Sequence, residues 1–361
     1  MKRDPVCNME VHESNALTTE FNGDIYYFCS EGCRETFLKS HPNRSKRTAY
    51  ELIIIGGGPA GLTAAVYAAT MKIDTFVIMN DLGGQAYDST KIDNYMGYDF
   101  ITGPELVQKF RSQLLHSHYV DHLLSEVEKV ETEDNGFIVT ATDLQSYRAK
   151  ALIVATGMTR RKLNLPGEEK FQRKGVFYGN IQDYTFVQGE DAAVIGGGNS
   201  ALQIVENLHT VARTIYLLSD YEITADRSVV ERVSRYRNLQ THENVKVLRI
   251  TGENTPSGIT FKRKASKQTA TVPVRGVFIS IGFQSNTGLF ANLVDLNDRK
   301  EIVINQDCST SRKGLFAAGD ATNAFGKRII IASGEGAKAA LAARKYIIDL
   351  RERADTIEKK S

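Results

Sequence analysis

Two glycine-rich loops constrain the fold of this 361-residue chain more than any other feature. They read Gly56-Gly57-Gly58-Pro59-Ala60-Gly61 and Gly196-Gly197-Gly198-Asn199-Ser200-Ala201. A short apolar run precedes each loop and small or apolar residues follow it, which predicts a strand, a tight turn and a helix. The first glycine permits the turn, and the second lets the backbone approach a pyrophosphate. The third position keeps helix and strand close, and the helix N-terminus offers free N–H groups to the phosphates. Two such units predict two bound dinucleotides, typically a flavin and a nicotinamide.

Composition narrows the class of protein. A chain of this length predicts two or three domains. Its 45 basic and 43 acidic residues leave no electrostatic footprint for nucleic acid. No apolar run reaches membrane-spanning length, and the polar start Met1-Lys2-Arg3-Asp4 is unlike a signal peptide. Three of the four cysteines fall within the first 33 residues, so we expect a reduced, cytoplasmic chain with one local sulfur-rich site.

The order of the motifs predicts the domains. Residues 1–44 form a small unit, which a polar, proline-broken stretch separates from the first glycine unit. The second glycine unit, 160–282, interrupts the domain that the first one begins, so that domain comprises 50–159 and 283–361. The predicted fold is α/β, with two Rossmann-like dinucleotide-binding domains, one inserted in the other, and a small N-terminal module.

Residues from about 50 to 350 resemble the low-molecular-weight thioredoxin reductases and the flavoprotein subunit of alkyl hydroperoxide reductase. Besides the two loops, short segments spread over this range carry the match: Gly83-Gly84-Gln85, Asn94, Ala155-Thr156-Gly157, Ile281-Gly282, Asn286-Thr287, Gly319-Asp320 and Ile329 to Ala337. The resemblance implies FAD in the discontinuous domain, a nicotinamide nucleotide in the inserted domain, and a homodimer.

The FAD site is expected to draw on several of these segments. Asp320 follows a predicted strand and is placed to accept hydrogen bonds from flavin ribityl hydroxyls, while Gln85 and Asn94 offer amide groups near the ring. The residues assigned to FAD are Gly56, Gly58, Pro59, Ala60, Gly61, Asn80, Gly84, Gln85, Asn94, Ala155, Thr156, Gly157, Gly319, Asp320, Arg328, Ile329 and Ile330.

The inserted domain is predicted to prefer NADH. Family members that use NADPH carry a His-Arg-Arg cluster after the second strand of this domain, whereas Tyr216 to Glu222 here contains no cation and two acids. Ser219 or Asp220 would hydrogen-bond a free 2′-hydroxyl. The residues assigned to the nicotinamide nucleotide are Gly196, Gly198, Asn199, Ser200, Ala201, Ser219, Asp220 and Gly282. NADPH, or a domain that binds no nicotinamide, remains the alternative.

The chain departs from the thioredoxin reductases at their redox Cys-x-x-Cys. The corresponding residues are Gly179-Asn180-Ile181-Gln182, which contain no sulfur. Thiol–disulfide exchange needs a thiolate at this position, so reduction of thioredoxin through it is excluded. Asp183, which follows and belongs to the family pattern, is the candidate proton donor.

The N-terminal unit resembles the small YHS/TRASH metal-binding domains. The resemblance rests on Asp4-Pro5-Val6-Cys7 and on the segment from Tyr26 to Cys33, with Cys29 and Cys33 one helical turn apart. Three thiolates, Cys7, Cys29 and Cys33, favour a thiophilic ion such as Zn(II) or Cu(I). Asp4, His12 or His41 is the candidate fourth ligand. A metal-free remnant, or a Cys29–Cys33 dithiol that exchanges electrons with the flavin, is the alternative, and Cys308 is expected to pack.

These features favour an FAD-dependent oxidoreductase that takes hydride from NADH. Without the disulfide, its electrons must pass to another acceptor, such as a metal ion at the cysteines, a small redox protein, a quinone or dioxygen. A metal-binding redox sensor or scaffold without turnover is one alternative function. A ferredoxin–nicotinamide reductase is another, although such enzymes commonly use NADPH.

Overall fold

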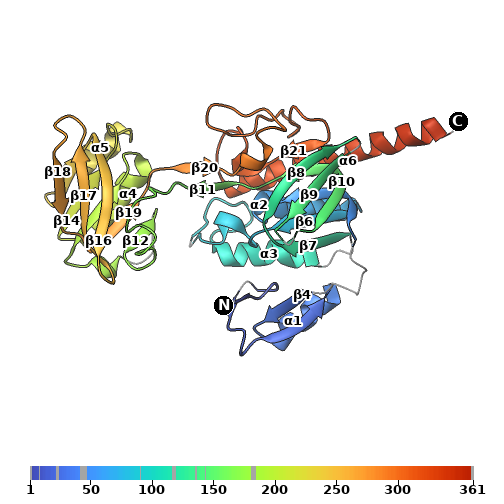
Figure 1. Cartoon of the computed structure of the whole chain (residues 1–361), viewed down its shortest axis with the longest axis horizontal. Helices are drawn as coiled ribbons and strands as arrows, with labels where there is room; N and C mark the ends of the chain where they lie inside the picture. The colour runs from blue at the N-terminus through green and yellow to red at the C-terminus, as the bar shows by residue number, and fades with distance from the viewer. Residues whose placement is uncertain are drawn as a thin grey trace. The chain divides into compact units, whose positions relative to one another are not determined.

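The chain forms two compact units, one inserted in the other. The computed structural model describes residues 2–7, 9–21, 24–40, 47–89, 91–115, 119–134, 136–142, 144–179 and 184–358. The first unit combines Met1–Met158 with Ser285–Ser361, and the second is Thr159–Gln284. The order of colours in Figure 1 follows this arrangement, since the chain returns to the first unit after completing the second. The predicted α/β fold with two Rossmann-like sheets is confirmed.

The N-terminal module is built from short strands and one helix. Its elements are β1 (Lys2–Arg3), β2 (Glu10–Val11), β3 (Leu17–Phe21), β4 (Asp24–Phe28) and α1 (Glu31–Ser40). Strands β1 and β2 pair, as do β3 and β4, both antiparallel. Only Val6, Phe28 and Phe37 form its fully buried apolar cluster among the described residues. A core this small provides little stability by itself.

A seven-stranded sheet organises the rest of the first unit. Its order is β7-β6-β5-β10-β9-β8, and β21 pairs with β10. The strands are β5 (Ala49–Ile55), β6 (Thr75–Met79), β7 (Val120–Leu124), β8 (Val127–Glu133), β9 (Gly136–Ala141), β10 (Ser146–Val154) and β21 (Leu315–Ala317). Strands β5, β6, β7, β10 and β21 run parallel, so their carboxyl ends meet at one edge of the sheet.

This sheet is buried on both faces because its apolar residues alternate between two clusters. Leu52 and Ile54 face the cluster that includes α2 (Pro59–Thr70), α3 (Gly103–Leu115) and α6 (Ile329–Glu358). Ile53 and Ile55 face the second cluster, which includes the short helix η3 (Gly288–Phe290). A run of β-branched residues therefore suits a two-sided parallel sheet.

The second unit repeats the plan on a smaller scale. Its five parallel strands have the order β12-β19-β13-β14-β15. They are β12 (Val176–Tyr178), β13 (Asp191–Ile195), β14 (Thr214–Leu218), β15 (Leu239–His242) and β19 (Gly276–Ile279). Helices α4 (Asn199–Leu208) and α5 (Arg227–Val233) pack on one face. An antiparallel sheet of β16 (Val245–Gly252), β17 (Pro256–Arg263) and β18 (Thr269–Val272) packs on the other.

Two further strands lie where the chain enters and leaves the second unit. They are β11 (Met158–Arg160) and β20 (Phe283–Ser285), and they pair with each other. Among the described residues, no helix has both the length and the apolar character that crossing a bilayer requires.

Each glycine loop brings backbone segments into direct contact. A Cβ on Gly56, whose φ is +121°, would lie 2.2 Å from the carbonyl oxygen of Ala155, and one on Gly61 would lie 2.0 Å from that of Gly56. The second loop behaves alike, since Gly196 has φ +136° and a Cβ there would lie 2.1 Å from the Ser280 oxygen. These positions need glycine for the fold itself.

Two glycines of α6 allow a matched test of how closely this helix approaches α2. Gly336 and Gly334 lie two residues apart in α6, but a Cβ on Gly336 would meet the Ala60 oxygen at 2.1 Å, whereas one on Gly334 would meet nothing within 4 Å. We expect Gly336→Ala to lower the free energy of unfolding by about 1–3 kcal/mol, because α2 must move. Gly334→Ala should raise it by about 0.5–1 kcal/mol, because alanine favours the helix. Denaturant unfolding followed by circular dichroism measures both, and equal stabilities would contradict the expected contact.

Candidate functional site

Most of the residues assigned to FAD lie at one edge of the large sheet. The Gly56–Gly61 loop follows β5, Asn80 follows β6, Ala155–Gly157 follow β10, and Gly319–Asp320 follow β21. Because these four strands are parallel, their carboxyl ends meet, and this is the edge at which doubly wound folds bind ligands. The fold therefore brings together segments separated by more than two hundred residues.

Gly58 fits a bound phosphate because the fold does not require glycine there. Its φ and ψ are −77° and −179°, an extended conformation open to any residue, and a Cβ on it would meet nothing within 4 Å. It is the N-cap of α2, where N–H groups lack helical partners. Open space above free N–H groups is what a pyrophosphate would occupy.

Asp320 offers a carboxylate that the described part of the protein leaves free. It lies in the short helix η4 (Gly319–Ala321), half-buried, and no described residue donates a hydrogen bond to its carboxyl oxygens. Burial raises its pKa above the ordinary value, against the opposing effect of Lys327 and Arg328. Such a carboxylate suits the hydroxyl groups of a flavin side chain.

Glu335 of α6 holds this turn in place, a role that was not predicted from the sequence. Its carboxylate accepts hydrogen bonds from the Gly319 N–H at 2.7 Å and from the Thr322 hydroxyl at 3.4 Å. It is almost fully buried, and burial raises its pKa. It belongs to the Ile329 to Ala337 segment of the resemblance, which was the available signal.

The side chains of the remaining FAD candidates lie mostly at the surface. Asn80 donates to Glu126 at 3.1 Å, and Gln85, in η1 (Gly84–Ala86), donates to the Met158 carbonyl at 2.6 Å. Asn94 is exposed. Arg328 is bonded to the carbonyl of its neighbour Lys327. The amides of Asn80 and Gln85 are thus partly used within the protein.

The nicotinamide candidates gather at the corresponding edge of the second unit. Gly196–Ala201 follow β13, Ser219–Asp220 follow β14, and Gly282 lies three residues beyond β19, all parallel strands. Gly198, the N-cap of α4, is extended and open like Gly58. The Asn199 side chain exchanges two hydrogen bonds with Asp226, so its amide is occupied.

Ser219 and Asp220, which the sequence left as equal candidates for the ribose contact, differ in their surroundings. Ser219 is 4% exposed, and its Oγ would lie 2.6 Å from a Cβ on Gly197, so it packs beneath the loop. Asp220 is half-exposed. The segment itself holds no cation, but Lys264 reaches Asp220 from 44 residues further along the chain. Sequence reasoning missed this contact.

Asp183, the candidate proton donor, lies outside the described residues, as do Asn180, Ile181 and Gln182. Gly179 is described. It has φ +72°, and the Arg160 guanidinium lies where a side chain would start, 2.1 Å from an added Cβ. A cysteine at this position would displace Arg160.

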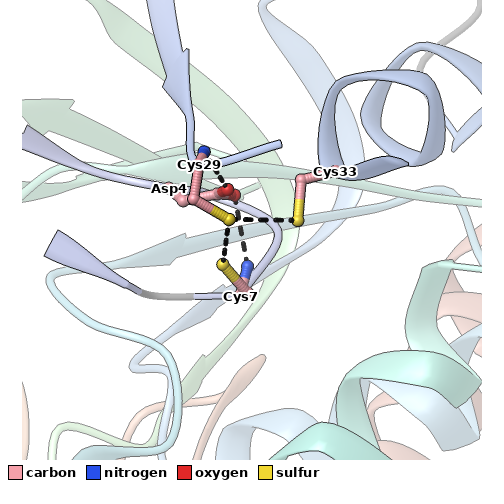
Figure 2. Close-up of side chains that lie close together, drawn as sticks. All are labelled: Asp4, Cys7, Cys29 and Cys33. Carbon is pink, nitrogen blue, oxygen red and sulfur yellow. Dashed lines mark hydrogen bonds between the residues drawn. The ribbon is translucent and has the colours of Figure 1, made fainter. Parts of the chain in front are cut away.

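The three N-terminal cysteines form one cluster, here called the thiol cluster. Figure 2 shows the side chains of Cys7, Cys29 and Cys33 converging with that of Asp4. The Sγ atoms of Cys7 and Cys29 are 3.2 Å apart, and those of Cys29 and Cys33 are 3.7 Å apart. The possible ligand atoms of all four residues lie within 4.8 Å of one another. This donor set fits a thiophilic ion, and the cysteines are free thiols.

Asp4 orders the backbone that carries the thiols. One carboxylate oxygen accepts from the N–H groups of Val6 and Cys7, and the other accepts from that of Cys29 at 2.8 Å. Burial would raise the pKa of Asp4, yet these hydrogen bonds hold it below its ordinary value. Of the three candidate fourth ligands, Asp4 joins the cluster, His12 is exposed and bonded to Ser14, and His41 lies outside the described residues.

The thiol cluster borders a cavity in the same unit. Cys7 lines it together with Leu82, Tyr87, Phe100 and Gln108, and its volume is about 610 Å³. Burial lowers the pKa of Arg111 on α3, and the nearby groups that oppose this effect are the three cysteines and Asp4. Cys308, in contrast, is fully buried in the first apolar cluster. Burial raises its pKa to about 11, consistent with a packing role.

Comparisons with known proteins match both parts of the chain to family models. The family model of the pyridine nucleotide-disulphide oxidoreductases matches residues 50–344, and that of the YHS domain matches 3–44. A Clostridium pasteurianum protein named "34.2 kDa protein in rubredoxin operon" is 34% identical over 299 residues, covering 82% of this chain and 97% of its own.

Two further relatives carry functional names. An alkyl hydroperoxide reductase subunit of Staphylococcus epidermidis is 33% identical over 302 residues, 83% of this chain and 59% of its own length. This chain therefore spans less than two thirds of that relative. The crystal structure of Lactococcus lactis thioredoxin reductase superposes with a TM-score of 0.69 at 28% identity, covering 83% of this chain and 99% of that one.

The open glycines allow each dinucleotide site to be blocked separately. We expect Gly58→Val to lose FAD, and Gly198→Val to keep FAD but weaken nicotinamide binding roughly tenfold or more, because a side chain fills the phosphate space. Flavin content and flavin bleaching by NADH measure these effects. Gly288→Val, at another open glycine, is the control and should change neither. Loss of FAD from Gly198→Val would contradict the assignment of the two domains.

The hydrogen bonds of Asp4 predict its effect on metal binding. Asp4→Asn replaces one acceptor oxygen by an NH₂ group that faces N–H donors, so we expect affinity for Zn(II) to fall roughly ten- to a hundredfold. Competition with a chromophoric chelator measures it. His12→Asn alters an exposed side chain and should leave the affinity unchanged. A loss with His12→Asn and none with Asp4→Asn would reverse the assignment.

Proposed function

Because the chain belongs to the pyridine nucleotide-disulphide oxidoreductase family, we propose that it is an FAD-dependent oxidoreductase that takes hydride from NADH and passes electrons to an acceptor other than a protein disulfide. The chemistry comes from bound FAD, which accepts hydride as a pair of electrons and can release them singly or together. The protein supplies binding and orientation.

One observation carries this proposal, the pair of open N-cap glycines. Gly58 and Gly198 lie at matching positions of two strand–turn–helix units, in conformations any residue adopts, with empty space above each. The N-termini of α2 and α4 would hold the phosphates of two dinucleotides. Asp320, in the turn whose Gly319 N–H is bonded to Glu335, would accept hydrogen bonds from the flavin side chain.

Asp220 supports NADH as the donor. It follows β14, where nucleotide-binding domains place the residue that contacts the adenosine ribose. A carboxylate there accepts a hydrogen bond from a free 2′-hydroxyl and repels a 2′-phosphate. Because Ser219 is packed under the loop, Asp220 is the better candidate for the ribose contact.

Two observations bear on the electron acceptor that we propose. Residues 179–182 contain no sulfur, so electrons do not leave through a disulfide at that position. The name of the Clostridium relative mentions a rubredoxin operon, which supports a small redox protein as the acceptor. A thiophilic ion at the thiol cluster is the second candidate. Copper bound there as Cu(II) could accept one electron and become Cu(I), whereas Zn(II) would only stabilise the module. We also propose that the enzyme works as a homodimer, as the family resemblance implies.

Anaerobic titration of the purified protein tests the proposal. We expect NADH to bleach the visible absorbance of the flavin stoichiometrically, at lower concentration than NADPH. Reoxidation by rubredoxin, compared before and after removal of metal by a chelator, then identifies the acceptor. Bleaching by NADPH alone would contradict the NADH assignment. No bleaching by either nucleotide would overturn the reductase and favour a metal-binding sensor.

A further inference from the structure

The ion pair between Asp220 and Lys264 joins two parts of the second unit. Lys264 directly follows β17, and its N–H donates to the Asn244 carbonyl at 2.9 Å, which fixes its backbone. Its Nζ lies 3.0 Å from Asp220 Oδ1 and also donates to the main-chain carbonyl of Asp220. The same ammonium lies 4.2 Å above the ring centre of Tyr221. Three neighbouring groups therefore hold this cation at Asp220.

This placement has two consequences for a nucleotide. A half-exposed carboxylate tied to an ammonium loses freedom to rotate, so it meets an incoming ribose in a fixed orientation. The ammonium lies beside the carboxylate that would contact the ribose, where a 2′-phosphate would call for a cation, but Asp220 already neutralises its charge. Tyr221 is 69% exposed, so the surface beside Asp220 and Lys264 is open to solvent and to a ligand.

We propose that Lys264 is a positioning residue that holds Asp220 for the ribose of NADH, and that it is also a masked cation. Removal of the Asp220 charge would free Lys264 for a 2′-phosphate, so one substitution would change the nucleotide preference. The inference rests on the proposed function in one respect only, since it takes the second unit to bind a nicotinamide nucleotide.

The effect on NADH tests the positioning role. The variant Lys264→Met is tested by stopped-flow reduction of the holoprotein with NADH. It should raise the NADH concentration for half-maximal rate about three- to tenfold, because the hydrogen bond between the Asp220 carboxylate and the ribose hydroxyl weakens. The limiting rate should not change. Lys264→Arg should restore most of the affinity. Lys267→Met, at an exposed position in the turn between β17 and β18, is the matched control and should behave as the unaltered protein. Unchanged NADH affinity in Lys264→Met would overturn this half of the proposal.

A double-mutant cycle tests the masked cation. Asp220→Asn should weaken NADH and tighten NADPH, roughly tenfold each. The double variant Asp220→Asn/Lys264→Met should lose the gain for NADPH while keeping the loss for NADH. If the gain survives in the double variant, Lys264 is not the phosphate ligand and the proposal fails. A lower NADPH affinity in Lys264→Met alone would also overturn it, since the cation would then already be free.

A binding measurement separates this inference from the proposed function. Shifts in Tm with NAD⁺ and NADP⁺ report binding to the second unit without hydride transfer. If the variants change these shifts as described but no nucleotide bleaches the flavin, the reductase fails and the inference stands. If both nucleotides bleach the flavin and the variants change nothing, the inference fails alone.

Discussion

The contact of backbone with backbone beneath each glycine loop is the constraint on which the two proposed nucleotide sites depend. In the first unit the Gly56 turn lies against Ala155 and the start of α2 lies against Gly56 itself, at distances that exclude even a methyl group. This contact aims the N-terminus of α2 at the edge where β5, β10 and β21 end. Asp320 follows β21 at the same edge, and Glu335 holds the turn that carries it through the Gly319 N–H.

Sequence reasoning succeeded where the signal is local. A glycine loop between an apolar strand and a small-residue helix needs only about twenty neighbouring residues, so both loops and the insertion were predictable. It failed where partners are distant in sequence. The register of the β16–β17 hairpin places Lys264 beside Asp220. No pattern in the sequence around Lys264 or around Asp220 predicts that contact. The burial of Ser219 likewise depends on how β14 ends beneath Gly197.

The N-terminal module depends on polar contacts more than on an apolar core. Its apolar cluster is small, and one buried carboxylate orders the backbone of two of its three cysteines. The residue types at the thiol cluster were evident in the sequence. The organising role of Asp4 was not, because an aspartate before a proline is also common in ordinary turns. Ligand geometry and the stability of the module thus rest on the same side chain.

Gly58 and Gly198 have a consequence for any survey of variants of this protein. Glycines such as Gly56 and Gly196 are fixed by the backbone, so substitution there reduces the amount of folded protein. Gly58 and Gly198 occupy ordinary extended backbone in open space, so we expect chains altered there to fold and to fail only when a nucleotide must bind. Two parallel selections, one for abundance and one for bound cofactor, would therefore disagree at these two positions. The size of that disagreement would locate the nucleotides without a structure of the complex.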